Sequence, residues 1–337
     1  MARQRNDVWD VAAADFPREA PIEKQLQFLL RYAILAPSTK NSQPWRFVVE
    51  GNQVQLFAEL ERGRQPIADP ENRELYISLG CALENLLVAA EHFGFNHEVR
   101  YLPERRHPEL AATVLVAPGA SPSPERTGIP LEAILARHND NSVYRPVSVP
   151  PQLLLQLEAC CVEPDLRVDL SSNRRFRSWI DELTLEADRL EFANPAFRKE
   201  LAQWIGQGVF GTPQPLARLG GFAIAHMNIG EPVARQDHGI VQSAALLGVI
   251  SASSDHHVSH IRAGQVFERV WLLATAAGVN VHPMSQTMRS PALRRAVGEL
   301  LHNRGWIPQH LFRLGYSSRN GEVQHTPRRA PDHVVKT

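Results

Sequence analysis

The segment APSTKNSQPWRF, residues 36–47, lies between the first helical pattern of the chain and its first strand-like pattern. Apolar residues recur at helical spacing over residues 23–35 and stop at Pro37, and from Trp45 the sequence alternates around Gly51-Asn52 as in a hairpin. A loop at such a junction exposes backbone and short polar side chains, which suit the polar edge of a flat heterocycle. A turn that only links helix to strand accounts for the same residues equally well.

The rest of the chain divides into two stretches joined by a segment rich in Pro, Ser and Gly at about residues 118–130. We predict an N-terminal half over residues 1–125 and a C-terminal half over residues 126–337. Helices are expected at 75–93, 131–137, 174–192, 195–206, 260–278 and 291–301, and strands at 97–102, 112–118, 245–251 and 310–316. Residues 207–237 carry several Gly and Pro residues, so we expect an irregular loop there, with the role of a lid.

An internal repeat supports the division into halves. Five residues of the first long helical window recur 184 positions later, and both windows end in a glycine followed by an apolar residue. The pairs are Ile77 and Ile261, Gly80 and Gly264, Glu84 and Glu268, Ala90 and Ala274, and Gly94 and Gly278. We interpret this as a duplication.

Composition excludes several classes of function. The 36 Lys and Arg residues equal the 36 Asp and Glu residues, so no overall field favours nucleic acid or an anionic membrane. The N-terminus lacks the apolar core of a signal peptide, and no window approaches the roughly 18 apolar residues of a membrane span. We therefore expect a cytoplasmic protein. Cys81, Cys160 and Cys161 form no C-x-x-C motif and are expected to be reduced.

Two further segments offer cations for a bound anion. The stretch RHNDNSVY begins at Arg137, which could grip a phosphate bidentately, with Asn139 as a neutral donor. The stretch TPRR places Arg328 and Arg329 after the last predicted strand, where they could complete a phosphate clamp. A solvated helix end and a basic tail explain these residues as well.

Six segments taken together resemble the nitroreductase superfamily, and most closely its Acg-like branch, in which two nitroreductase-like halves are fused. They are APSTKNSQPWRF, DPENR (69–73), RHNDNSVYRPVSVP (137–150), IRAGQVFERVWLLATAAGV (261–279), PMSQ (283–286) and TPRR (326–329). The resemblance covers about residues 25–330. It implies an α+β fold in which the fused halves form a pseudo-dimer, as a monomer or within a homodimer, around FMN at the internal interface.

The resemblance also assigns roles to particular residues. Arg137 and Asn139 match a motif that holds the FMN phosphate and the pyrimidine edge. Asn141 stands where that motif usually has Arg or Lys near flavin N1 and O2, and we expect its lack of charge to lower the reduction potential unless Lys40 replaces the cation. The remaining matches are Pro37, Ser38, Thr39 and Asn41 against the ring, Pro283, Met284, Ser285 and Gln286 near flavin N5 and O4, and Arg328 or Arg329 at the phosphate.

The function implied is that of an FMN-binding oxidoreductase. It would take hydride from NAD(P)H at flavin N5 and pass it to a nitro compound, a quinone or a similar acceptor, with no side-chain acid or base. Because the first half has the ring loop and only the second half has the phosphate motif, we expect one flavin per chain. The alternative is a flavin-sequestering protein whose lid covers the ring.

Two other patterns are set aside. The sequence GQGVFG (206–211) fits a dinucleotide fingerprint but follows a helical pattern instead of a strand, and it runs into prolines. The histidines at 256, 257 and 260 have no carboxylate or cysteine at a recognised ligand spacing, so a polar helix start is preferred over a metal site.

Overall fold

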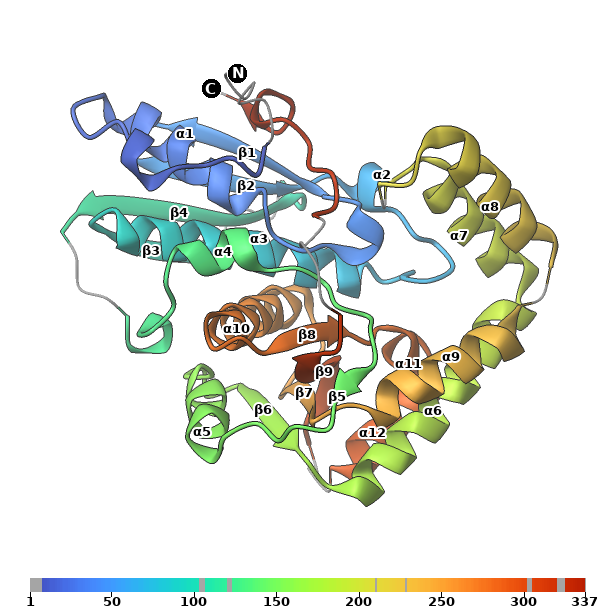
Figure 1. Cartoon of the computed structure of the whole chain (residues 1–337). Helices are drawn as coiled ribbons and strands as arrows, with labels where there is room; N and C mark the ends of the chain where they lie inside the picture. Colours follow the sequence, from blue (N-terminus) through green and yellow to red (C-terminus); the bar gives the residue numbers. More distant parts are fainter. Residues whose placement is uncertain are drawn as a thin grey trace.

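A computed structural model shows the arrangement of the chain (Figure 1). It describes residues 8–102, 107–119, 123–209, 211–227, 229–301, 305–319 and 325–336. Two five-stranded sheets face each other across a layer that contains two long helices, so the predicted α+β class is confirmed.

The first sheet has the strand order β10-β1-β2-β4-β3. Its strands are β1 (Trp45–Glu50), β2 (Gln53–Ala58), β3 (Phe95–Tyr101), β4 (Leu110–Pro118) and β10 (Val335–Lys336). The predicted hairpin is confirmed: β1 and β2 pair antiparallel from Trp45↔Ala58 to Glu50↔Gln53, and Gly51 in the turn has a φ of 56°. Helix α1 (Ile22–Ala33) packs on this sheet and leads directly into the loop at 36–44.

The second sheet has the order β5-β9-β7-β6, and β8 also pairs with β9. Its strands are β5 (Tyr144–Arg145), β6 (Leu166–Ser171), β7 (Leu246–Ala252), β8 (Asn280–Pro283) and β9 (Ile307–Ser317). Every residue of β7 is buried, which explains why it reads as a continuous apolar run and not as an alternating strand.

Helices α3 (Arg73–His92) and α10 (His257–Ala276) form the central layer and contain four of the five repeated pairs, and the fifth, Gly94 and Gly278, follows their ends. Gly80 and Gly264 meet where the two helices cross. A Cβ added to Gly80 would overlap the carbonyl oxygen of Ile261, and one added to Gly264 would overlap that of Ile77. The two contacts are equivalent under the repeat, because Ile261 and Gly264 are the counterparts of Ile77 and Gly80, 184 positions earlier. The two helices are therefore related by a local pseudo-twofold axis through the glycines.

One apolar core runs through both halves, and the C-terminal segment returns to the first half. Leu79 on α3, Trp271 on α10 and Phe312 on β9 belong to the same buried cluster. The tail from residue 325 crosses back so that β10 pairs parallel with β1. The halves are therefore packed as one body, and the boundary at residue 125 stays a proposal.

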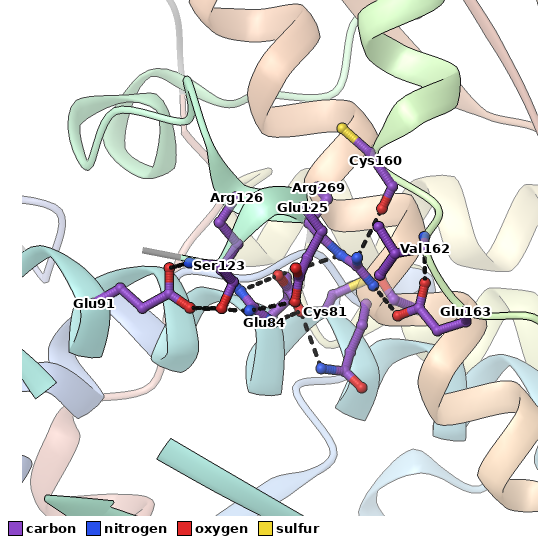
Figure 2. A network of polar contacts seen from close by, with 12 residues as sticks. Cys81, Glu84, Glu91, Ser123, Glu125, Arg126, Cys160, Val162, Glu163 and Arg269 are labelled. Carbon is purple, nitrogen blue, oxygen red and sulfur yellow. Dashed lines mark hydrogen bonds and ion pairs between the residues drawn. The ribbon is translucent and has the colours of Figure 1, made fainter. Parts of the chain in front are cut away.

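The predicted linker is partly anchored. Residues 120–122 lie outside the described residues, as do residues 1–7 of the N-terminal half. Pro124–Arg126 form a short 3-10 helix, and Arg126 is buried and ion-paired with Glu84 at 2.7 Å and Glu91 at 3.0 Å (Figure 2). Composition alone does not reveal that one charge of this segment, Arg126, is a buried anchor.

The expectation of an irregular loop over 207–237 is wrong. Most of this stretch forms α8 (Gln214–His226) and the start of α9 (Gly230–Gln242). Its prolines lie at helix starts, where an absent N–H costs nothing: Pro213 is the N-cap of α8, and Pro215 and Pro232 are in the first turns.

The other predicted helices are confirmed. They correspond to α4 (Glu132–Ala136), α6 (Arg174–Ala193), α7 (Pro195–Gly206) and α12 (Pro291–Leu300), and further helices are α2 (Leu60–Gly63), α5 (Pro151–Ala159) and α11 (Gln286–Arg289). Helix α7 packs against α8, and α6 against α9. No helix in the described ranges combines the length and apolar character needed to cross a bilayer.

Candidate functional site

A cavity of about 330 Å³ opens where the loop at 37–41 and the tail at 325–328 meet α3, α10 and the residues that follow α4. This volume falls within the range of small-molecule pockets, ~300–1,000 Å³. The residues lining it are Trp9, Pro37, Ser38, Thr39, Lys40, Asn41, Glu74, Ile77, Ser78, Cys81, Arg137, His138, Asn139, Asn141, Phe267, Trp271, Pro283, Ser285, Arg289, His310, His325, Thr326 and Arg328.

Most residues named from sequence come together in this one cavity, although they are spread over nearly 300 positions. They are Pro37, Ser38, Thr39, Asn41, Arg137, Asn139, Asn141, Pro283, Ser285 and Arg328. Both halves contribute, because the loop comes from the first half and the other residues come from the second.

The structure does not bring the other three named side chains to the cavity. Met284 is buried in a separate apolar cluster of the second half. Gln286 starts α11 and donates to Asp237 at 3.0 Å. Arg329 pairs with Glu59 and donates to the carbonyl oxygen of Trp45, which ties the tail to the first sheet. Consecutive residues of an extended tail point in opposite directions, so only Arg328 faces the cavity.

Two arginines, Arg137 and Arg328, define one end of the cavity, which we call the cationic end. Arg137 is 2% exposed, and its Nη2 donates to the carbonyl oxygen of Leu35 at 2.7 Å. Arg328 donates to the same oxygen at 3.1 Å and to Asn41 Oδ1 at 3.0 Å. The Nε of Arg328 has no hydrogen-bond partner among the described residues, whereas that of Arg137 lies 3.3 Å from Glu268 Oε1.

The charge at the cationic end is only partly balanced. Glu268 lies 3.3 Å from Arg137, but burial raises the pKa of this carboxyl to about 7 despite Arg137. Burial also lowers the pKa of Arg328, and the neighbouring Arg137 adds to the effect. Two guanidinium groups thus share one half-protonated carboxyl, which leaves an excess of positive charge suited to an anion.

The loop at 38–43 is held in an uncommon backbone conformation. Lys40, Asn41 and Gln43 have φ angles of 49°, 53° and 50°. Such left-handed residues are uncommon outside glycine and tend to cluster at binding sites. The loop is kept in place by Thr39 N donating to Ser78 Oγ at 3.1 Å and by Asn41 Nδ2 donating to the carbonyl oxygen of Pro327 at 3.0 Å.

Asn139 and Asn141 are exposed residues that line the cavity. A parallel bridge between Asn139 and Val281 fixes this segment against the end of the second sheet. Asp140 between them points the other way and accepts from the backbone N of Ser142 at 2.8 Å. Both asparagine side chains are therefore available to a bound ligand.

The other end of the cavity, which we call the histidine end, is formed by Glu74, Ser285 and His310. Glu74 accepts from Arg73 Nη2 at 2.7 Å and from Ser285 Oγ at 3.0 Å. Arg73 and further cations hold the pKa of this carboxyl below its usual range although it is buried. Sequence reasoning named Ser285 but missed Glu74 and His310, because Glu74 belongs to a helical stripe and His310 to an apolar strand, and both patterns indicate core.

Lys40 joins the loop to helix α7. Its Nζ lies 3.3 Å from Glu200 Oε1, and Glu200 also accepts from the backbone N of Ile67 at 2.9 Å. Burial lowers the pKa of Lys40 to about 8. The carbonyl oxygen of Val209, which follows α7, accepts from Asn41 Nδ2 at 2.6 Å. The α7–α8 hairpin is thereby fastened beside the loop.

Neither the histidines at 256, 257 and 260 nor Gly206 of the dinucleotide-like pattern lines the cavity. His256 caps α10 by accepting from Ser259 N at 3.3 Å, and His260 pairs with Asp255 at 2.8 Å. Gly206 ends α7, so the glycine-rich stretch follows a helix. In the described part of the chain, no group of three or more His, Cys, Asp and Glu residues could hold a metal ion.

No protein-family model matches the chain. Among curated proteins, "Putative NAD(P)H nitroreductase Rv3131" of Mycobacterium tuberculosis is 27% identical over 94% of this chain and 92% of its own length. From the same organism, "Putative NAD(P)H nitroreductase acg" is 26% identical over 90% of this chain and 93% of its own length. "Probable NAD(P)H nitroreductase PigM" of a Serratia species is 22% identical over 94% of each.

Among solved structures, a nitroreductase with bound FMN from Desulfitobacterium hafniense matches with a TM-score of 0.39 and 12% identity, over 63% of this chain and 96% of its own. The curated relatives extend over nine-tenths or more of both proteins. They confirm that the chain resembles the nitroreductase superfamily, including its Acg-like members.

Proposed function

We propose that this protein is an FMN-dependent oxidoreductase that transfers hydride from NAD(P)H to a nitro compound, a quinone or a similar acceptor. The observation that carries the proposal is the cationic end of the cavity, where Arg137 and Arg328 converge on the carbonyl oxygen of Leu35. A ligand with a dianionic phosphate would supply an acceptor to Arg328 Nε, which has none among the described residues, and would balance the excess charge.

The rest of the cavity fits the other parts of FMN. In the proposed arrangement Asn139 and Asn141 serve the pyrimidine edge, and Ser38, Thr39 and Asn41 pack against the ring. Bound FMN would supply the hydride chemistry at its N5 atom. The residues of the chain bind it, orient it and leave one face accessible, so a catalytic triad is unnecessary.

FMN uptake by purified protein tests the proposal. The protein is expected to be yellow or to become so with added FMN, and Arg137→Gln and Arg328→Gln are each expected to weaken FMN binding about tenfold or more, since a charge-assisted hydrogen bond to phosphate contributes ~1.5–3 kcal/mol. Arg329→Gln is the matched control and should bind FMN as the wild type does. A protein that stays colourless with added FMN would refute the proposal.

A second candidate function is flavin sequestration, and the fastening of α7 beside the loop favours it. Glu200 binds both Lys40 and the backbone of Ile67, so the α7–α8 hairpin can restrict access to the ring. Anaerobic mixing of the yellow protein with NADPH separates the two functions. Rapid bleaching of the flavin supports the reductase, whereas a persistent oxidised spectrum supports sequestration.

A further inference from the structure

His310 is a buried histidine whose ring has no hydrogen-bond partner within the described residues. It lies on β9, is 3% exposed and lines the cavity, and neither Nδ1 nor Nε2 is bonded. Buried polar atoms are nearly always paired, so an imidazole with both nitrogens unpaired in a cavity wall indicates a group that a ligand completes.

The ring is held in place by aromatic packing. Its centroid lies 4.2 Å from that of Phe267 and 6.3 Å from that of Phe312. Burial lowers the pKa of His310 to about 4, although the charge of Glu74 opposes this change. At neutral pH the imidazole is therefore uncharged, with one nitrogen as a donor and the other as an acceptor.

The position of His310 separates it from the anion-binding end. Glu74 and Cys81 both line the cavity from α3, and their separation of seven residues corresponds to about 10 Å along the helix. Glu74 lies at the histidine end, and Cys81 lies near Arg137 and Glu268. A ligand with its phosphate at the cationic end would thus direct its far end, and any second molecule stacked on it, toward His310.

We infer that His310 donates a hydrogen bond to the oxygen of an aromatic electron acceptor, a nitro or quinone oxygen that gains negative charge on reduction. The inference rests on the proposed function. A quinone that receives one hydride and one proton from solvent becomes a hydroquinone. A nitro group that receives one hydride and one proton from solvent becomes a nitroso group, and the N–O bond that breaks releases its oxygen as water. In both cases His310 keeps its own proton. A fixed neutral donor stabilises such an oxygen without first having to release water.

The test measures acceptor binding to the oxidised, FMN-loaded protein without NAD(P)H, so that no turnover occurs. Two neutral probes are titrated while the visible flavin absorbance is recorded: 4-nitrobenzyl alcohol, and 4-methylbenzyl alcohol, which lacks the acceptor oxygens. The wild type is expected to bind the nitro compound more tightly. His310→Phe is expected to reduce this preference about three- to tenfold, as for one lost hydrogen bond, and His310→Gln, which keeps an N–H donor, to retain most of it.

Two controls make the outcome specific. His282→Gln alters a histidine on the adjacent strand β8 that does not line the cavity and already accepts from Arg313 Nε at 3.1 Å, so its nitro preference should equal that of the wild type. His310→Leu removes the donor as well and replaces the Phe variant if that variant does not fold.

The result that overturns the inference is an unchanged nitro preference in a folded, FMN-loaded Phe or Leu variant. Weaker FMN binding with an unchanged nitro preference also overturns it, because His310 would then contact the flavin. Failure of the wild type to take up FMN refutes the proposed function instead, so the two failures are distinguishable.

Discussion

Glu268 is placed to make anion binding at the cationic end depend on pH. Its pKa of about 7 means that it is neutral below this pH and ionised above it, 3.3 Å from Arg137. For folding, the native protein holds this proton between about pH 4.5 and 7 while the unfolded chain does not, so this group's contribution to stability falls as pH rises through that window. For binding, ionised Glu268 cancels part of the arginine charge.

The expected consequence is seen in FMN affinity between pH 6 and pH 8. The ratio of the Kd of wild type to that of Glu268→Gln is expected to rise about three- to tenfold over this range, because only the wild type gains a carboxylate near the phosphate. Quenching of flavin fluorescence measures both values. Ionisation of the phosphate itself is common to both proteins and cancels in the ratio, so a constant ratio would show that Glu268 does not affect the ligand.

Asn141 leads to a prediction about reduction potential. It lines the cavity at an exposed position and carries no charge where relatives in the superfamily are expected to have a cation. Asn141→Arg should raise the two-electron potential of bound FMN by about 30 mV if the new charge is worth ~1.4 kcal/mol to the reduced anion. Equilibration with a reference dye measures this change. An unaltered potential would mean that position 141 does not face the ring, or that Lys40 already supplies the cation.

Individual site residues can be predicted from the sequence where they belong to recognisable motifs. Arg137, Arg328 and the residues at 37–41 were identifiable because the motif pattern itself sets them apart from core residues. Glu74 and His310 were not identifiable from the sequence. Glu74 is a carboxylate in a helical stripe and His310 lies between apolar strand residues, and neither local pattern distinguishes a cavity wall from a core. Only the fold makes them neighbours: Arg73, beside Glu74 on α3, donates to the carbonyl oxygen of Gln309, beside His310 on β9.

The crossing of α3 and α10 depends on two glycines. An added Cβ on Gly80 would lie 2.9 Å from the Cα of Gly264 and would overlap a backbone carbonyl that cannot move by itself. Gly80→Ala should therefore destabilise the protein by about 3 kcal/mol or more, because the helices must separate or shift. Gly220→Ala on α8, where nothing lies within 4 Å of the new methyl group, is the control and should change stability by less than about 1 kcal/mol, toward greater stability. Chemical denaturation of both variants measures the difference, and equal midpoints would contradict a close helix crossing.

Elements with strong periodicity were predictable, and α3, α10 and the β1–β2 hairpin appear where expected. The helices within residues 207–237 were not predictable, because Gly and Pro are tolerated at the start of a helix but destabilise its interior. Pro213 and Pro215 initiate α8, and only the position of the first turn, which the sequence leaves undetermined, distinguishes the two cases.

The pseudo-twofold relation between α3 and α10 has a consequence for the whole molecule. Glu84 is the counterpart of Glu268 in the repeat, but its surroundings differ. Arg126 and Arg269 lie 2.7 Å and 3.4 Å from Glu84, and Arg269 also pairs with Glu163 (Figure 2). The charges here are balanced by side chains of the protein, so the position that mirrors the cationic end has no excess positive charge.

One FMN per chain is the expected stoichiometry, because a second phosphate at the mirrored position would have to displace Glu84 from both arginines. Titration of the flavin-free protein should saturate at one FMN, as measured by calorimetry or by the flavin released on denaturation.

Arg126→Gln is expected to keep this stoichiometry and to lower stability by about 3–5 kcal/mol, since it leaves buried Glu84 with a weaker partner. Arg137→Gln should weaken FMN binding while the ion pairs of Glu84 stay intact. Saturation at two FMN per chain would show that the ion pairs around Glu84 open to admit a ligand, and that the two halves are alike in function as well as in their central helices.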